Sequence, residues 1–253
     1  MAGHSKWANR VHRKTRQDKR RAKTFSKLSR MIQVAAREGG DDPEYNPNLR
    51  MYIDKAKDAE MPKENIERAI KAGTGELEGV NYEPAVYEGY GPTGVAMIIK
   101  VLTDNNKRTV AEIRNIMKEH QGSLGEAGSV RWMFESKGVV TLQSEACDYD
   151  EVFMIGAEAG AEDVIMDEDD GTIEVRTDPQ DLTNVYEALK EAGLETDRSE
   201  LTMIPTATHE VSDADAPKVM KLLDRLNDHD DVEQIYSNFE VSDEAMEAYD
   251  VAS

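Results

Sequence analysis

From residue 80 onward, the sequence alternates between segments with the periodicity of strands and segments with the periodicity of helices. GVAMIIKVL (94–102) is almost entirely apolar, as a buried strand is, and TVAEIRNIMKEHQG (109–122) then has Val110, Ile113 and Met117 at helical spacing. VRWMF (130–134) is predicted to be the second strand of this unit. Two such β-α-β units make one ferredoxin-like layer of helices on a sheet.

The same unit recurs three more times. The second unit is GVVTL (138–142), a helix over 152–159 and EDVIM (162–166); the third is TIEV (172–175), a helix over 182–189 and LETDRSELTMI (194–204); the fourth is ATHEV (207–211), a helix over 219–226 and DVEQIYSNFEV (231–241). Four units predict two ferredoxin-like domains, and the pattern leaves open which units pair.

Residues 24 to 78 predict a small bundle of three helices. The first has Phe25, Leu28 and Ile32 on one face and stops at two glycines; the second follows DDPEYNPN (41–48), and the third begins near Pro62 and ends at Gly73. Amphipathic helices joined by short polar connections bury their apolar stripes against one another. The expected fold class is therefore α+β, with an N-terminal three-helix domain followed by two ferredoxin-like α/β domains.

The N-terminus concentrates positive charge on an acidic chain. Residues 1 to 30 hold eleven Lys and Arg against one Asp, a net charge of +10, and the other 223 residues hold 20 basic and 50 acidic residues, a net charge of −30. Basic residues occur on every side of a helical projection of residues 4–23, so this segment has no face to bury. We predict a basic arm that contacts nucleic acid, the alternative being a solvated charged tail.

Lys and Arg in this arm are expected to contact phosphates, while Trp7 stacks on unpaired bases. Lys107 and Arg108 also belong to the predicted nucleic-acid-binding residues, because they lie at the start of a predicted helix, where cations and backbone N–H groups together bind phosphate. The alternative is that this segment only caps the helix. The predicted nucleic-acid-binding residues are His4, Lys6, Trp7, Arg10, Arg13, Lys14, Arg16, Lys19, Arg20, Arg21, Lys23, Lys107 and Arg108.

Three loops have patterns that also occur at binding sites, and each has a turn as its alternative interpretation. EGYGPTG (88–94) is glycine-rich but lacks the Lys-Ser or Lys-Thr of a phosphate-binding P-loop, so it predicts a turn between two strands. The acidic run 167–170 is followed by Gly171, and Asp-Gly signals a tight hairpin rather than a cation site. GSLGEAGSVRW (122–132) is interpreted either as a contact loop or as a tolerant turn.

No motif of a known catalytic class is present, so we predict a protein that is not an enzyme and has no catalytic residues, no metal ligands and no cofactors. Cys147 is the single cysteine and cannot form an internal disulfide, which favours a cytoplasmic location. No apolar run has the length of a membrane span, and no membrane partner is expected. A mitochondrial presequence is the alternative interpretation of the basic start, and the lack of an apolar stripe over residues 8–24 argues against it.

Several stretches resemble the YebC family, which includes the mitochondrial translational activator of cytochrome c oxidase subunit I. They keep their order and spacing along essentially the whole chain: MAGHSKWANRVHRK, LRMYIDKAKDAEMPKENIERAIKAGTG, YEGYGPTGVAMII, TDNNKRTVAEIR, QGSLGEAGSVRWMF and VEQIYSNFE. The resemblance implies that units one and four pair as one domain, and that units two and three form a domain inserted within it.

The resulting domain prediction has five parts. They are a basic arm (1–23), a helical bundle (24–78), a split α/β domain (79–136 and 205–240), an inserted ferredoxin-like domain (137–204) and a C-terminal tail (241–253).

The resemblance also implies two functions, because members of the family are described both as ribosome-associated translation factors that help synthesis through proline-rich stretches and as DNA-binding transcriptional regulators. The arm has no helix-turn-helix setting to aim it at a groove, so ribosomal RNA is the favoured partner and DNA the alternative. A protein that binds the acidic surface of the α/β domains is a further candidate partner.

Overall fold

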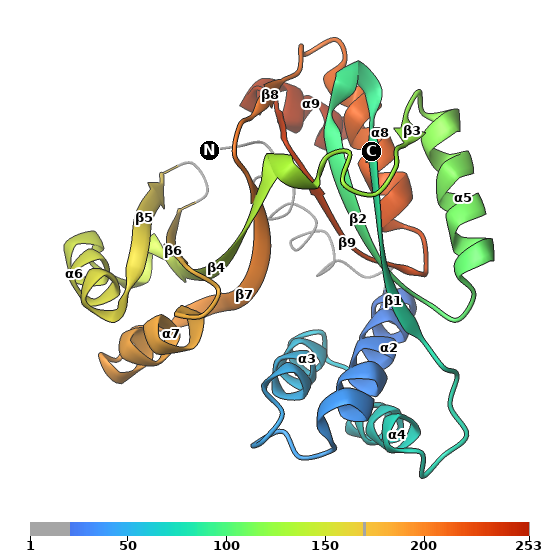
Figure 1. Ribbon diagram of the computed structural model, residues 1–253. Helices are drawn as coiled ribbons and strands as arrows, with labels where there is room; N and C mark the ends of the chain where they lie inside the picture. Colours follow the sequence, from blue (N-terminus) through green and yellow to red (C-terminus); the bar gives the residue numbers. More distant parts are fainter. Residues whose placement is uncertain (1–20, 169–170, 253) are drawn as a thin grey trace. The chain divides into compact units, whose positions relative to one another are not determined.

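The computed structural model describes residues 21–168 and 171–252. The chain divides into two compact units, residues 132–208 and residues 21–131 with 209–252. The first unit is thus an insertion in the second (Figure 1). Helices at the N-terminus and two antiparallel four-stranded sheets confirm the predicted α+β class and the inserted domain.

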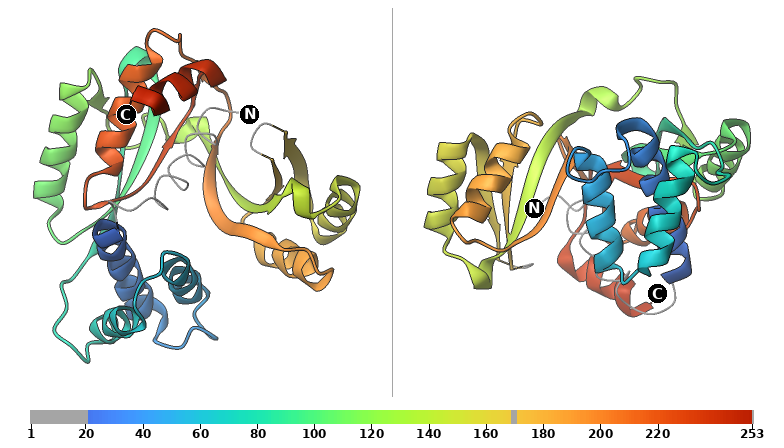
Figure 2. Two further views of the ribbon diagram at one scale, coloured as in Figure 1. Left: turned by 180° about the vertical axis from the view of Figure 1, so that it is seen from behind. Right: turned by 90° about the horizontal axis from the view of Figure 1, so that it is seen from below.

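Three helices follow one another at the start of the described chain, namely α2 (Arg21–Gly39), α3 (Pro47–Asp58) and α4 (Lys63–Thr74). Ile32, Leu49 and Ala56 are fully buried between them. The backbones of α2 and α4 approach so closely that a Cβ atom at Gly73 would lie 2.3 Å from the carbonyl oxygen of Gln33. A glycine is therefore required where these two helices cross. Figure 2 shows the three helices from below, packed side by side.

The first sheet has the order β3-β1-β2-β9, and every neighbouring pair is antiparallel. Its strands are β1 (Glu83–Tyr90), β2 (Ala96–Thr103), β3 (Ser123–Leu124) and β9 (Val232–Ser237). Met97 and Ile99 on β2 share one core with residues of α5 (Asn106–Glu119) and α8 (Ala216–Asn227), so both helices cover the same face of the sheet. The turn predicted over 88–94 is shorter in the structure, because β1 extends to Tyr90; the link from β1 to β2 contains a short 3-10 helix, Pro92–Gly94.

Two predicted strands near the C-terminus are shorter than expected. ATHEV provides only β8 (His209–Glu210), which pairs in parallel with β10 (Phe239–Glu240). The predicted strand 231–241 breaks at Asn238, whose side-chain oxygen accepts a hydrogen bond from the backbone N–H of Ala96 at 2.9 Å. This side-chain bond takes the place of a ladder bond and separates β9 from β10. The chain then forms α9 (Asp243–Ala252), where the sequence pattern predicts no element.

The inserted unit has strands in the order β5-β6-β4-β7, all antiparallel. Its elements follow along the chain as β4 (Phe134–Gln143), α6 (Tyr149–Ala159), β5 (Ala161–Asp167), β6 (Thr172–Thr177), α7 (Leu182–Glu191) and β7 (Thr196–Pro205). Val140 and Leu142 on β4 pack with residues of α6 and α7, so both helices lie on one face of this sheet. The antiparallel pairing of Asp167 with Thr172 confirms the predicted hairpin.

The prediction of separate strands at 130–134 and 138–142 is wrong. Residues Arg131–Met133 form a 3-10 helix, and β4 then runs without a break from Phe134 to Gln143. The N–H groups of Val130 and Arg131 donate to the side chain of Glu88 and are therefore unavailable to a strand ladder. In the part of the chain that the structure describes, no helix is both long and apolar enough to cross a bilayer.

Candidate nucleic-acid interface

The predicted binding residues fall into two groups. His4, Lys6, Trp7, Arg10, Arg13, Lys14, Arg16, Lys19 and Arg20 lie outside the described residues. Arg21 is the first residue of α2, Lys23 lies in the first turn of that helix, and Lys107 and Arg108 lie in the first turn of α5. The structure therefore describes the surroundings of the Lys23, Lys107 and Arg108 side chains.

The first half of α2 presents a row of cations at helical spacing to the end of α8. Lys27 Nζ donates to the carbonyl of Asn227 at 2.7 Å, and Arg30 Nη1 donates to the carbonyl of Asp230 at 3.0 Å. Lys23 Nζ donates to the carbonyl of Asp228 and lies 3.6 Å from the carboxylate of Asp230. The negative end of a helix dipole and its unpaired carbonyls attract cations, so this contact is favourable before any carboxylate is counted.

Asp231 is the centre of a buried polar cluster that joins three segments of the chain. Its carboxylate accepts hydrogen bonds from Arg30 at 2.7 Å, from Arg108 at 2.7 Å and from the Thr109 hydroxyl at 2.7 Å, and the side chain of Asp231 is 3% exposed. The Thr103 hydroxyl is 3.3 Å from the same carboxylate. The cluster ties α2, the start of α5 and the loop before β9 together.

The surroundings of Asp231 fix its charge. Burial by itself would raise the pKa of the carboxyl, but hydrogen bonds from Thr109, Arg108 and Arg30 outweigh burial and lower the pKa to about 2. In return, hydrogen bonds to Asp231 and to Asp104 raise the pKa of Arg108. Asp231 is therefore an anion, paired with two guanidinium groups, at any physiological pH.

Lys107 and Arg108 differ in what they offer a ligand. The guanidinium of Arg108 donates to Asp104 at 2.8 Å and to Asp231 at 2.7 Å, so these carboxylates already occupy it. Lys107 is exposed, and within residues 21–168 and 171–252 no ion pair or hydrogen bond involves its side chain. The first turn of α5 is capped by Asn105, whose side chain accepts from the N–H of Arg108 at 3.1 Å. Lys107 is thus the more accessible cation of the two.

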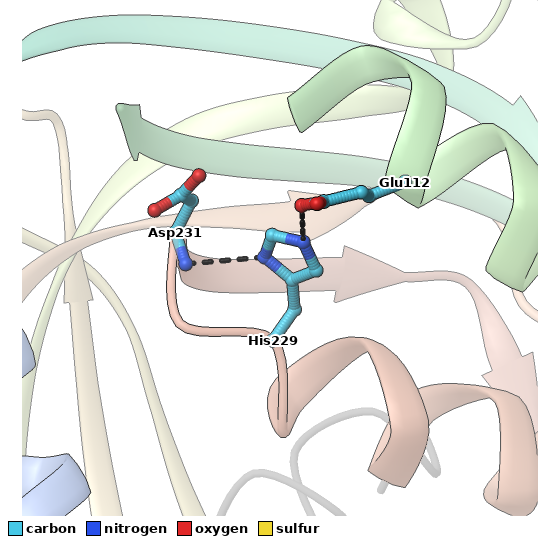
Figure 3. A group of neighbouring side chains, drawn as sticks. All are labelled: Glu112, His229 and Asp231. Carbon is cyan, nitrogen blue, oxygen red and sulfur yellow. Dashed lines mark hydrogen bonds and ion pairs between the residues drawn. The ribbon is translucent and has the colours of Figure 1, made fainter. Parts of the chain in front are cut away.

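Glu112, His229 and Asp231 come close enough to suggest a metal site, with one ligand atom of each within 4.8 Å of the others (Figure 3). The N–H of Asp231 donates to Nδ1 of His229 at 3.1 Å, which places the ring proton on Nε2, and Nε2 then donates to Glu112 at 3.0 Å. Both ring nitrogens are occupied, and the Asp231 carboxylate faces two guanidinium groups. This geometry is that of a hydrogen-bonded loop anchor, in which the imidazole and the Asp231 carboxylate already have partners.

The glycine-rich loop 122–132 is held in place by a buried carboxylate that the sequence pattern does not reveal. Glu88 on β1 is 9% exposed and accepts from the N–H groups of Gly128 at 2.7 Å, Val130 at 2.8 Å and Arg131 at 2.8 Å. Burial tends to raise the pKa of Glu88, but these three backbone donors lower it overall. The loop is therefore an organised turn around an anion.

Cys147 in the inserted unit is not poised as a nucleophile. Burial, together with the nearby carboxylates of Glu151 and Asp148, raises the pKa of its thiol. A thiol that stays protonated at neutral pH is a weak nucleophile. The thiol donates a hydrogen bond to the carbonyl of Gln143 at 3.2 Å, and Cys147 packs against the core of the inserted unit.

Comparisons with known proteins find relatives that match nearly the whole length of the chain. Residues 5–76 match the TACO1/YebC protein N-terminal domain, and residues 82–239 match the TACO1/YebC second and third domain. A protein of Persephonella marina named "Probable transcriptional regulatory protein" is 55% identical over 248 residues, which are 98% of this chain and 99% of that protein. A protein of Halothermothrix orenii with the same name is 53% identical over 250 residues, 98% of each chain.

A solved structure agrees with these matches. The crystal structure of a conserved hypothetical protein from Aquifex aeolicus is 44% identical in sequence and superposes with a TM-score of 0.80, covering 89% of this chain and 93% of that chain. With both domain models matched and curated relatives aligned end to end, the chain belongs to the TACO1/YebC family.

Proposed function

We propose that this protein regulates gene expression by binding nucleic acid through its basic N-terminal residues, without covalent chemistry. The observation that carries the proposal is the charge asymmetry of the chain, +10 over residues 1–30 and −30 over the rest. The acidic part repels a polyanion over a Debye length, about 8 to 10 Å at physiological salt. The basic N-terminal segment is therefore the part of the chain that a nucleic acid approaches most readily.

DNA is the target that the names of the relatives support, since they are probable transcriptional regulatory proteins. In this form of the proposal, the protein is a DNA-binding transcriptional regulator. The cations of the N-terminal segment supply affinity for the phosphate backbone, and sequence preference requires further contacts to base edges or to DNA shape.

Ribosomal RNA is the second candidate, and the charge of the helical domain favours it. A DNA reader of the helix-turn-helix type places its second helix in the major groove. Here α3 and α4 each hold three basic and two acidic residues, so neither helix presents a strongly cationic surface to a groove. Structured RNA offers phosphate-lined crevices and unpaired bases, which suit a basic peptide containing a tryptophan. In this form, the protein is a ribosome-associated factor that aids synthesis through proline-rich stretches.

The test compares two full-length variants with the same change in charge. In one, Lys6, Arg10, Arg13 and Lys14 are replaced by Gln; in the other, Arg50, Lys57, Lys63 and Arg68, all exposed on α3 and α4, are replaced by Gln. Binding to fluorescent duplex DNA and to ribosomes is measured between 50 and 200 mM salt. Engagement of roughly 6 to 10 phosphates predicts a loss of about 10³ to 10⁵ in affinity over this range.

The N-terminal variant is expected to lose most of its binding, and the control variant is expected to retain it. Equal losses in the two variants would contradict the proposal, because net charge alone would then explain the binding. The choice of nucleic acid is tested separately. A transcriptional regulator should bind its own promoter at least about 10³ times more tightly than random DNA, whereas a ribosomal factor should co-sediment with ribosomes and show no such preference.

A further inference from the structure

The cationic row of α2 carries an inference beyond the N-terminal segment. Lys23, Lys27 and Arg30 follow at spacings of four and three residues and so share one face of the helix. All three point to residues 227–231, the last residue of α8 and the Asp-His-Asp-Asp that follows it. Cations that directly continue a basic nucleic-acid-binding segment are thus occupied by an anionic loop of the same compact unit.

The strength of this contact changes along the helix. At the Arg30 end, the side chains of Arg30 and Asp231 are 20% and 3% exposed and form a direct ion pair. At the Lys23 end, the side chains of Lys23 and Asp230 are 39% and 65% exposed and their charged atoms are 3.6 Å apart. Exposed pairs contribute about 0 to 1 kcal/mol and weaken with salt, whereas a buried pair cannot be broken without leaving an uncompensated charge. The contact is therefore exchangeable at Lys23 and permanent at Arg30.

We propose that the lysine face of α2 is a second phosphate-binding surface, and that loop 228–231 acts as its internal competitor. Nucleic acid held by the N-terminal residues reaches Lys23 and Lys27 next along the chain and displaces Asp230 and the carbonyls of Asn227 and Asp228. Arg30 stays on Asp231, so the helix keeps its place while the loop loses its two lysines. This inference rests on the proposed function, because a nucleic acid must first be bound by the residues that precede α2.

Phosphate is the better partner for these lysines. A lysine forms a shorter and stronger hydrogen bond with a phosphate oxygen than with a neutral carbonyl. Each lysine that neutralises a phosphate also releases condensed counterions, a gain in free energy that the carboxylate of Asp230 does not provide. The contacts given up include the exposed ion pair of Lys23 with Asp230 and the bonds to the carbonyls of Asn227 and Asp228. Water can replace these contacts, since Asp230 is exposed and Asn227 and Asp228 are partly exposed.

The test measures how binding depends on salt in four full-length proteins. They are the natural chain, Lys23→Gln with Lys27→Gln, Asp230→Asn, and Lys63→Gln as a matched control from α4, whose lysine is 89% exposed. The probe is a 20-base-pair duplex, with a 20-nucleotide RNA as a second probe. Log affinity falls as log salt rises, with a slope of roughly −0.9 for each phosphate that is neutralised. If both lysines bind duplex phosphates, the slope of the double variant should therefore be less negative than that of the natural chain by roughly 0.9 per lysine.

Asp230→Asn is expected to raise affinity roughly two- to fivefold, which matches the loss of one exposed competing pair. Lys63→Gln should leave both affinity and slope unchanged. Hydrogen exchange of the amides of residues 229–231 should become faster when the duplex is added. Circular dichroism and thermal unfolding confirm first that each variant is folded; Lys23→Gln alone serves if the double variant is not.

The outcomes separate this inference from the proposed function. If the N-terminal variant loses binding while the α2 double variant keeps the natural slope and Asp230→Asn keeps the natural affinity, the proposed function stands and the second surface is refuted. If the N-terminal variant binds normally, the proposed function itself fails. A double variant that binds like Lys63→Gln, with no change in exchange at 229–231, would show that the loop never releases α2.

Discussion

Two buried carboxylates organise the unit formed by residues 21–131 and 209–252 in different ways. Asp231 is held mainly by side chains, two guanidinium groups and two threonine hydroxyls, which come from α2, the end of β2 and the start of α5. Glu88 is held by three backbone N–H groups of one loop, all between residues 128 and 131. The first carboxylate joins distant segments, and the second shapes a single turn.

The two carboxylates differ in which donor groups lose their acceptor when the carboxylate is removed. Without Asp231, the buried part of Arg30 loses its counter-charge, and removing one partner of a buried ion pair is costly. Without Glu88, the N–H groups of Gly128 and Arg131, two exposed residues, lose an acceptor that water can replace, and only the N–H of Val130 is left at a buried residue. We therefore expect changes at Asp231 to destabilise the whole unit and changes at Glu88 to loosen one loop.

The largest effect is expected for Asp231→Ala. It removes the acceptor of Arg30, Arg108 and Thr109 together, and it should lower the free energy of unfolding by about 3 to 5 kcal/mol. Chemical denaturation measures the change. A loss below about 1 kcal/mol would mean that water enters the site freely and that the cluster contributes little to stability.

A smaller and more local effect is expected for Glu88→Gln. The amide can accept from Val130 and Arg131, but its NH2 group then faces the N–H of Gly128, so at least one hydrogen bond to a charged acceptor is lost, worth about 1.5 to 3 kcal/mol. Hydrogen exchange should become faster at residues 128–131 and stay unchanged at 229–231. Faster exchange at both sites would remove the distinction between the two carboxylates.

The pH dependence of stability follows from the lowered pKa of Asp231. Its pKa is about 2 in the folded chain and 3.8 in the reference state, so its ionised form contributes about 2 kcal/mol above the reference pKa. This contribution is lost as pH falls through the folded pKa. The pKa of Glu88 is also lowered, so protonation of Glu88 at low pH decreases the free energy of unfolding as well. Unfolding free energies between pH 7 and pH 2 should therefore fall less steeply in Asp231→Asn than in the natural chain.

The smallest effect is expected for Thr109→Val, which keeps the shape of the side chain. The substitution removes a buried donor 2.7 Å from Asp231 while both guanidinium groups remain, so the loss should be about 1 kcal/mol. The melting temperature measures it. A loss as large as that of Asp231→Ala would mean that the hydroxyl, rather than the ion pairs, fixes the carboxylate.

Local patterns in the sequence predict the elements of the fold. The spacing of Phe25, Leu28 and Ile32 identifies α2, and the Asp-Gly step at 170–171 identifies the hairpin between β5 and β6. β4 is predicted in two pieces because Glu135, Ser136 and Lys137 interrupt its apolar pattern. The strand is continuous in the structure because pairing with β7 extends from residue 134 to residue 142.

The sites are harder to predict, because their partners are far apart along the chain. Asp231 is separated from Arg30 by 201 residues and from Arg108 by 123, and in the sequence it is simply one of several acidic residues in a loop. Arg108 is a reasonable phosphate ligand by position, yet its guanidinium faces two carboxylates that local spacing cannot reveal. Glu88 falls in the segment 88–94 that the sequence predicts to be a turn, where a charge would ordinarily face solvent, but in the structure it lies on β1.

The pairing of Phe134 with Pro205 means that the inserted unit begins and ends on neighbouring strands. A peptide of a few residues is therefore long enough to take the place of the insertion in the chain. Closing a loop whose ends already lie together has a small entropic cost that rises slowly with length. None of the strands of the β3-β1-β2-β9 sheet lies within the inserted unit. Evolution or protein engineering can therefore lengthen, exchange or remove this unit without removing a strand from that sheet.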